Sequence, residues 1–478
     1  MDAEFEALSI YILSGTAGTG KSTVAYEFAK RLEDEGLLGA SFFFIRGAEK
    51  FNSTRFVIPS LAVQLARNKP ELYSHIVEAS RTHIGLGMRQ QLEFQLQDLF
   101  IKPLKCLPSD HPPLVIIIDA VDECTESGQN EVAHLLFLLM KNIHQVPFPL
   151  RVLFTTRPEL HIEVALSAFE FRHLTKQFKL QDIPLDTVNE DISQFLEEGF
   201  VRFRFKKELA EKRPNAIAEL TKRAEGLFIY ASTARNFIFW HVDHPDDAVR
   251  KIDRLLSEEE YLVPAVNGQL DKLYLTVLDQ AFPSYMLEQV NFTVNLRDSL
   301  ASLALLQDHV SPRTLESLLG ISTNDTTRIL SRLGSVVQLS DNLDTEIRPI
   351  HASFPQFLID NTRCTNPLFF INSATQHERF ASVCLTILSG PRMVRENLQN
   401  TAPPHVQYAC LHWATHLSLA NPTPALFTLL HVFLTSKLLV WFEILSTIKR
   451  LNVAALALFR VRKWVQVSTL YGTAESKF

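Results

Sequence analysis

Residues 10–23 constrain the fold of this chain more than any other stretch, and they read Ile-Tyr-Ile-Leu-Ser-Gly-Thr-Ala-Gly-Thr-Gly-Lys-Ser-Thr. The apolar run at 10–13 predicts a buried strand. Residues 23–32 predict a helix with Val24, Phe28 and Leu32 on one face. Between strand and helix, the letters GTAGTGKS fill every fixed position of the phosphate-loop pattern G-x-x-x-x-G-K-[ST]. The stretch therefore predicts a strand, a phosphate-binding loop and a helix.

The residue types of this loop suit the binding of a nucleotide. Glycines allow the backbone to turn so that successive N–H groups point toward phosphate oxygens, and the helix that follows adds the positive end of its dipole. Lys21 is expected to contact the β- and γ-phosphates, and the Ser22 hydroxyl is expected to bind Mg²⁺. The residues predicted to hold the nucleotide are Gly15, Thr16, Ala17, Gly18, Thr19, Gly20, Lys21, Ser22 and Thr23.

Composition narrows the class of protein. The 478 residues predict about three domains, and a net charge of −6 gives no electrostatic case for nucleic acid or an anionic membrane as the main partner. The five cysteines form no C-x-x-C pair, which argues against a disulfide framework and favours a reducing compartment. No signal peptide is visible at the start of the chain, so we expect a cytoplasmic protein.

Strand and helix patterns alternate after the first helix. Strands are predicted at 40–45, 114–118 and 151–155, with helices between them at 59–68, 93–107 and 130–143. This alternation predicts βαβ units, and hence a parallel sheet with helices on both faces. We place this α/β nucleotide-binding domain at residues 1–188.

The rest of the chain is predicted to be mostly helical. We expect a helical domain at 189–290 and an all-α region at 363–478. Between them, three short helices at 296–306, 311–319 and 323–333 precede two strand-like pieces, the order of a winged helix, which we place at 291–362.

The long apolar run at 425–448 contains His431, Lys437 and Glu443 and is expected to form two buried helices of a globular domain rather than a membrane span.

A second motif supports the phosphate loop. The predicted apolar strand at 114–118 is followed directly by Asp119, which matches the acidic position that binds Mg²⁺ in phosphate-loop enzymes. Asp122 and Glu123 follow on the next loop, and either of them is a candidate for the base that activates water. Because these acids come after a complete phosphate loop in a βα alternation, we predict a catalytic centre rather than an ordinary strand end.

Three further residues are candidates for sensing the nucleotide. Arg157 follows the predicted strand at 151–155, and ligands of open α/β sheets lie beyond the carboxyl ends of strands, so Arg157 and Thr156 are candidates for the γ-phosphate. The alternative is an ordinary surface arginine before a proline. His351 follows the predicted wing and is either a packed histidine or a nucleotide contact. His412 and His416 have zincin spacing but lack its glutamate, so we predict no zinc site there.

These motifs resemble those of the NACHT branch of signalling phosphate-loop ATPases (the STAND class), especially its fungal incompatibility-type and NLR-like members. The resemblance rests on residues 13–23, 41–44, 118–123, 155–158, 224–231 and 351–358. It implies that His351 contacts the β-phosphate of ADP from the winged helix. It also implies ATP or ADP with Mg²⁺ as ligands, with GTP not excluded, and self-association through the nucleotide-binding domain. Members of this family carry effector and repeat domains, so we expect this chain to be the switch module.

We therefore expect a nucleotide-dependent switch with weak ATP hydrolysis that opens and self-assembles in signalling. Two alternatives stay open. One is a turnover ATPase or small-molecule phosphotransferase, although no acceptor-binding motif is recognisable. The other is a degenerate adaptor without nucleotide, which the intact Lys21, Ser22 and Asp119 disfavour.

Overall fold

The computed structural model describes residues 9–48, 51–85, 91–124, 129–159, 162, 164, 175–257, 268–390 and 402–475. The chain divides into two compact units. The first comprises residues 1–206 and 215–232, and the second comprises 207–214 and 233–478.

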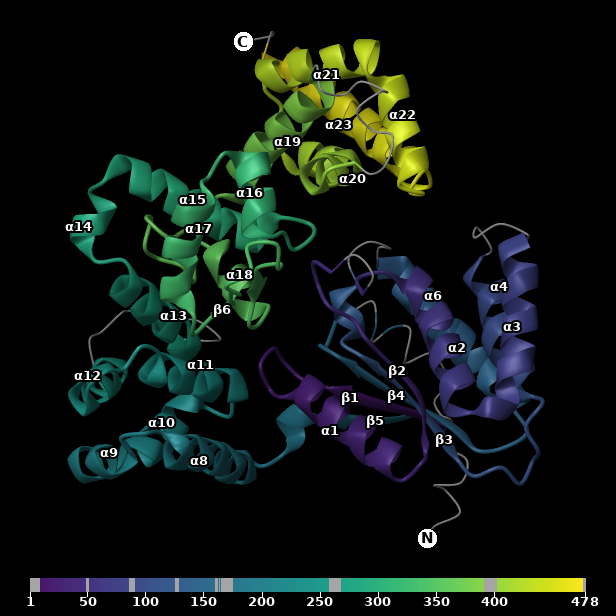
Figure 1. The fold of residues 1–478 in the computed structure, drawn as a ribbon, viewed down its shortest axis with the longest axis horizontal. Coiled ribbons are helices and arrows are strands. Elements are labelled where there is room, and N and C mark those ends of the chain that lie inside the picture. Colours follow the sequence, from purple (N-terminus) through teal and green to yellow (C-terminus); the bar gives the residue numbers. More distant parts are fainter. Residues whose placement is uncertain are drawn as a thin grey trace. The chain divides into compact units, whose positions relative to one another are not determined.

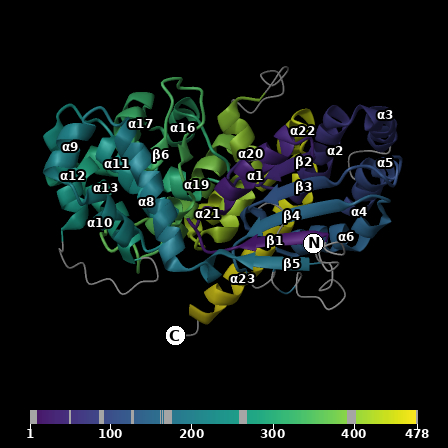
Figure 2. The same cartoon turned by 90° about the horizontal axis from the view of Figure 1, so that it is seen from below.

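The first unit is built on a parallel five-stranded sheet of order β2-β3-β4-β1-β5, seen side by side in Figure 2. The strands are β1 (Ile10–Ser14), β2 (Leu38–Phe43), β3 (Leu114–Asp119), β4 (Leu150–Thr156) and β5 (Thr175–Lys179). Four of them were predicted. The sequence did not predict β5, because it is a lysine-containing edge strand whose side chains are partly or fully exposed.

Helices cover both faces of the sheet, because side chains of a strand alternate between faces. On one face, Val115 and Ile117 of β3 pack against α1 (Lys21–Asp34). On the other face, Ile116 and Ile118 belong to a larger core with α2 (Val57–Asn68) and α6 (Gln129–Asn142) (Figure 1). Every residue of β3 is therefore buried, which explains its unbroken apolar run.

The packed face of α1 differs from the prediction. Val24 and Phe28 are 47% and 41% exposed, whereas Ala25, Ala29 and Leu32 face the sheet. Alanines allow the helix to approach the strands closely, and larger side chains would hold the helix away. The prediction that Val24, Phe28 and Leu32 share the packed face is therefore wrong for Val24 and Phe28, and Leu32 alone of the three is buried.

Further helices complete the first unit. They are α3 (Pro70–Gly85), α4 (Leu92–Leu96), α5 (Lys102–Leu104), α8 (Leu185–Arg202) and α10 (Ala216–Ala224). Helix α11 (Phe228–Phe239) begins in the first unit and continues into the second. The predicted helix at 93–107 is interrupted, because a π-helical turn at Gln97–Ile101 separates α4 from α5.

In the part of the chain that is described, the second unit is helical except for one short hairpin. Its helices are α9 (Lys206–Lys212), α12 (Pro245–Leu256), α13 (Gly268–Ala281), α14 (Ser284–Leu287), α15 (Val290–Leu305), α16 (Pro312–Leu319), α17 (Thr323–Leu330), α18 (Ser353–Leu358), α19 (Ser373–Ser389), α20 (Pro404–Leu419), α21 (Pro424–Ser436), α22 (Leu438–Thr447) and α23 (Val453–Glu475).

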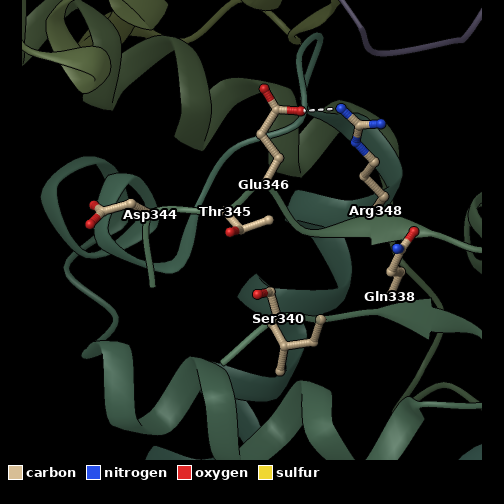
Figure 3. Close-up of a pocket in the computed structure, with 7 residues that line it drawn as sticks. Gln338, Ser340, Asp344, Thr345, Glu346 and Arg348 are labelled. Atoms are coloured by element: carbon tan, nitrogen blue, oxygen red, sulfur yellow. Dashed lines mark hydrogen bonds and ion pairs between the residues drawn. The ribbon is translucent and has the colours of Figure 1, made fainter. Parts of the chain in front are cut away.

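Helices α15, α16 and α17 precede an antiparallel pair, β6 (Val337–Gln338) and β7 (Arg348–Pro349), in the predicted winged-helix order. A hollow of about 510 Å³ lies in the connection of this hairpin, where Glu346 and Arg348 form an ion pair of 2.7 Å (Figure 3). Its lining residues are Gln338, Leu339, Ser340, Asp344, Thr345, Glu346 and Arg348, none of which the sequence assigned to a site.

The C-terminal helices pack around two buried tryptophans, Trp413 of α20 and Trp441 of α22, whose rings lie 5.6 Å apart. Within the described ranges, no single helix has the length and hydropathy to cross a membrane. Among the described helices, one pair, α21 and α22, has this length and composition when taken together, and the two helices are bent by 72° at the break between them.

Candidate nucleotide-binding site

The phosphate loop joins β1 to α1, as predicted. Two of its glycines have positive φ angles, 81° at Gly18 and 91° at Gly20. L-residues with a side chain rarely adopt this conformation, so the loop requires glycine at both positions. Helix α1 begins at Lys21, immediately after the loop, so its N-terminal N–H groups are directed at the loop. Positive φ angles in a loop that leads into a helix N-terminus are the features by which phosphate loops present backbone donors to an anion.

Lys21 lies buried within this loop. Its Nζ donates to the carbonyl oxygens of Gly15, at 2.7 Å, and Thr16, at 2.8 Å. Burial lowers the pKa of Lys21 to about 8, a shift that Asp122 opposes and Arg157 adds to. A pKa near 8 still leaves the ammonium mostly protonated at neutral pH, so the loop holds a positive charge where the phosphates are predicted.

Asp119 ends β3 and is 2% exposed. Burial raises the pKa of this carboxyl group, while hydrogen bonds from the Thr155 and Ser22 hydroxyls oppose the rise. The hydrogen bond to Ser22 shows that the two predicted Mg²⁺ ligands lie together.

Among the described residues, no group of three His, Cys, Asp or Glu side chains is arranged to hold a metal ion. Ser22 and Asp119 nevertheless fit Mg²⁺, since this ion is usually held by one or two protein oxygens, phosphates and water.

Asp122 and Glu123 differ in their contacts. Asp122 accepts a hydrogen bond from the backbone N–H of Arg157 at 2.9 Å and forms an ion pair with its Nε at 3.0 Å, and the Asp122 side chain is 5% exposed. Glu123 accepts from the backbone N–H of Arg46 at 3.1 Å and lies 3.8 Å from the Arg157 guanidinium. Burial is the main cause that raises the pKa of Glu123. Asp122 is therefore engaged in positioning Arg157, and Glu123 is the more accessible of the two carboxylates.

Arg157 follows β4, at the carboxyl end of the sheet, and its charge acts on both Lys21 and Glu123. The alternative, an ordinary surface arginine, does not fit these contacts, because only 18% of the side chain is exposed. Thr156 is buried, and its hydroxyl donates to the carbonyl oxygen of Arg157 at 2.9 Å.

Two contacts at the site were not assigned from the sequence. The Thr155 hydroxyl contacts Asp119, and the backbone N–H of Ile229, in the first turn of α11, donates to the carbonyl oxygen of Gly18 at 3.1 Å. The sequence signal near the second contact was Gly226 alone, and in the structure both Glu225 and Gly226 have positive φ angles, 48° and 77°. Such a left-handed pair redirects the chain before α11.

His351 lies in the second unit, just before α18. Its Nδ1 accepts from the backbone N–H of Ser353 at 3.1 Å and lies 2.7 Å from the Ser353 hydroxyl, which in turn is 2.7 Å from the Tyr274 hydroxyl. Because Nδ1 accepts a hydrogen bond from the backbone, the neutral ring carries its proton on Nε2. The ring is thus oriented as an Nε2–H donor, while its role toward nucleotide stays a prediction.

Comparison with known proteins gives one family match. The family described as "Nephrocystin 3, N-terminal" matches residues 4–157, about a third of the chain. No curated protein sequence matches.

Among solved structures, the chain is similar to the Walker-type ATPase PABY2304 of Pyrococcus abyssi, with 13% identity, a TM-score of 0.35, and coverage of 74% of this chain and 91% of the other. The chain is similar to the structure of Drosophila ORC bound to DNA, with 12% identity, a TM-score of 0.28, and coverage of 72% of this chain and 87% of the other. The chain is also similar to the ORC2 protein of Aeropyrum pernix, with 13% identity, a TM-score of 0.26, and coverage of 73% of this chain and 85% of the other.

Because these identities and TM-scores are low, the fold assignment rests on the motifs and the sheet of this chain. The complete phosphate-loop motif lies between a strand and a helix, the sheet is parallel, and Asp119 ends the strand two positions away from β1 in the sheet. The first unit is therefore a P-loop NTPase domain.

Proposed function

We propose that this chain is an ATP- and ADP-binding molecular switch of the NACHT type, with slow hydrolysis of ATP and self-association in signalling. The observation that carries the proposal is the grouping of Lys21, Asp119, Glu123 and Arg157 around the phosphate loop. Such a group supplies a cation for the phosphates, an acid for a metal ion, a second acid for water and a sensing cation.

Each residue has a distinct part in this proposal. The loop N–H groups and Lys21 bind the phosphates, and Ser22 and Asp119 hold Mg²⁺, which neutralises phosphate charge when bound. Glu123 orients and deprotonates the attacking water, because Asp122 is already engaged with Arg157. Arg157 contacts the γ-phosphate and so distinguishes ATP from ADP.

The switch requires that the two nucleotides favour different states. We infer that His351 donates from Nε2 to the β-phosphate of ADP in a closed state, and that ATP favours an open state able to self-associate. We also infer a cytoplasmic location, in keeping with five cysteines that form no disulfide.

Nucleotide carried through purification tests the proposal directly. The recombinant chain should retain ADP or ATP, Lys21→Ala should lose it, and Lys30→Ala, an exposed lysine on the same helix, should keep it. Stoichiometric nucleotide in Lys21→Ala would refute the site, and a nucleotide-free wild type that binds neither ADP nor ATP would favour the degenerate adaptor.

Steady-state phosphate release, with and without added acceptor molecules, separates a switch from a turnover enzyme. A switch gives well under the ~10 turnovers per second typical of enzymes. Fast or acceptor-stimulated release would instead identify the turnover ATPase or phosphotransferase.

A further inference from the structure

Thr155 is a fully buried residue of β4 whose single hydroxyl makes two contacts at the end of β3. Oγ1 donates to Oδ1 of Asp119 at 2.5 Å and accepts from the backbone N–H of Ala120 at 2.8 Å. A threonine hydroxyl has one donor and two acceptor positions, so both contacts are made with the proper polarity.

The sheet itself brings Thr155 to this place. Strands β3 and β4 are parallel, and Ile118 pairs with Phe154, so Thr155 follows on β4 where Asp119 follows on β3. Because the register of neighbouring strands is held by the backbone ladder, the position of the hydroxyl does not depend on a flexible loop.

The contact with Ala120 matters for the turn after β3. Ala120 has φ 54° and ψ 49°, a left-handed conformation that is unfavourable for a residue with a Cβ. The chain then enters the short 3₁₀ turn Val121–Glu123. By accepting the Ala120 N–H, the Thr155 hydroxyl satisfies the buried donor at the point where the turn begins.

The contact with Asp119 ties one carboxylate oxygen to a rigid strand. Residues behind a metal ligand typically fix its orientation, and their loss costs metal affinity even though they do not touch the ion. The Ser22 hydroxyl lies next to the same carboxylate.

We propose that Thr155 is a positioning residue that holds the Asp119 carboxylate, together with the turn toward Glu123, in the orientation that receives a Mg²⁺–nucleotide complex. This inference rests on the proposed function, since it takes Asp119 as the Mg²⁺ ligand.

The test compares four chains: wild type, Thr155→Val, Thr155→Ser and Thr54→Val. Valine keeps the shape of threonine and removes the hydroxyl, and serine keeps the hydroxyl. Thr54 is a matched control, because it is equally buried and its hydroxyl also donates to a carboxylate, that of Glu131 at 3.0 Å, outside the candidate site. Affinity for a fluorescent ATP analogue is measured with Mg²⁺ and with EDTA, and the melting temperature is recorded.

Thr155→Val should raise the Mg²⁺ concentration needed for half-maximal binding about tenfold. Its affinity in EDTA should stay at the wild-type value. Thr155→Ser should bind like wild type, and Thr54→Val should lower the melting temperature without changing the Mg²⁺ requirement. If Thr155→Val does not fold, Thr155→Cys, which retains only a weak donor, should show a smaller shift in the same direction.

An unchanged Mg²⁺ requirement in Thr155→Val would overturn the inference, and so would an equal loss of affinity in Mg²⁺ and EDTA, which indicates a structural role alone. These outcomes leave the proposed function standing, because the wild type still binds nucleotide with Mg²⁺. A wild type that binds nothing under either condition would overturn both.

Discussion

Ile229 and Gly18 are in direct contact: the Ile229 backbone N–H donates to the Gly18 carbonyl oxygen at 3.1 Å, and a Cβ at Gly18 would lie 2.0 Å from Cγ2 of Ile229. The first turn of α11 therefore packs on the phosphate loop with no room for a side chain. The same helix begins in the first unit and continues into the second.

Gly18→Ala should destabilise the loop for two reasons. Its φ of 81° is unfavourable for alanine, and the new methyl group overlaps Ile229. We expect a loss of about 1–3 kcal/mol in the free energy of unfolding and a weaker affinity for ADP. Urea unfolding and ADP titration measure both.

The double variant with Ile229→Ala should recover part of this loss, because the overlap is relieved while the unfavourable φ persists. Gly36→Ala is a matched control, since its φ is also positive, at 70°, and nothing lies within 4 Å of its Cβ position. If Gly18→Ala is no more harmful than Gly36→Ala, the contact with Ile229 has no energetic importance.

Glu123→Gln and Asp122→Asn should behave differently. Glu123→Gln should leave ATP affinity and the melting temperature near wild type and slow hydrolysis about 10²-fold or more, as expected for loss of a general base. Asp122→Asn should lower the free energy of unfolding by about 1–3 kcal/mol, because it weakens a buried hydrogen-bonded ion pair with Arg157. Single-turnover hydrolysis, ATP titration and thermal unfolding on both variants separate the roles. The assignment is wrong if Asp122→Asn alone abolishes hydrolysis without loss of stability.

His351→Ala should weaken ADP binding selectively. A charge-assisted hydrogen bond to the β-phosphate contributes about 1.5–3 kcal/mol, so ADP affinity should fall by about 10- to 100-fold while ATP affinity is spared. The fraction of assembled protein at a given ADP concentration should rise, as light scattering would report. A packed histidine predicts the opposite pattern, a lower melting temperature with the ratio of ADP to ATP affinity unchanged.

Acid should destabilise the second unit through a buried histidine pair. Nδ1 of His377 and Nδ1 of His416 lie 2.9 Å apart, and Nε2 of His416 lies 2.7 Å from the Tyr408 hydroxyl. Burial lowers the pKa of His377 from 6.5 to about 4. The pKa of His416 is lowered well below 6.5, mainly by burial and to a smaller extent by the charges of His377 and His412.

A histidine with a lowered pKa contributes stability that is fully present above pH 6.5 and is lost as the pH falls toward 4, because the unfolded chain binds the proton more tightly. For His377 this loss is about 3 kcal/mol once complete. Unfolding at pH 7.5 and pH 5 should show the effect in wild type, and His377→Gln should show less of it. The exposed His431→Gln should behave as wild type, and equal pH dependence in all three chains would contradict this explanation.

Much of the first unit could be predicted because its signals are local. The apolar strand, the glycine-rich loop and the helix after it are consecutive, and glycine at positions 18 and 20 is required by backbone angles within the loop itself. Asp119 was predicted in the same way, since an unbroken apolar run of β3 ends at an acid. The helical character of the second unit also followed from periodicity along the chain.

Other features depend on residues far apart in the sequence. The different contacts of Asp122 and Glu123 depend on Arg157, some 35 residues away, because only the folded sheet brings its side chain to 3.0 Å from Asp122 and 3.8 Å from Glu123. Which face of α1 is packed depends on the close approach of this helix to the sheet. Strand β5 is recognisable only from its pairing with β1 at the edge of the sheet.

The sequence by itself determined which backbone turns and charged side chains the site contains, since these depend on neighbours within a few positions. Only the tertiary structure decided which groups meet: Thr155 with Asp119 through strand register, and Ile229 with Gly18 through the return of α11. The physical reason is that hydrogen bonds and van der Waals contacts act over a few ångströms in space, whatever the separation along the chain.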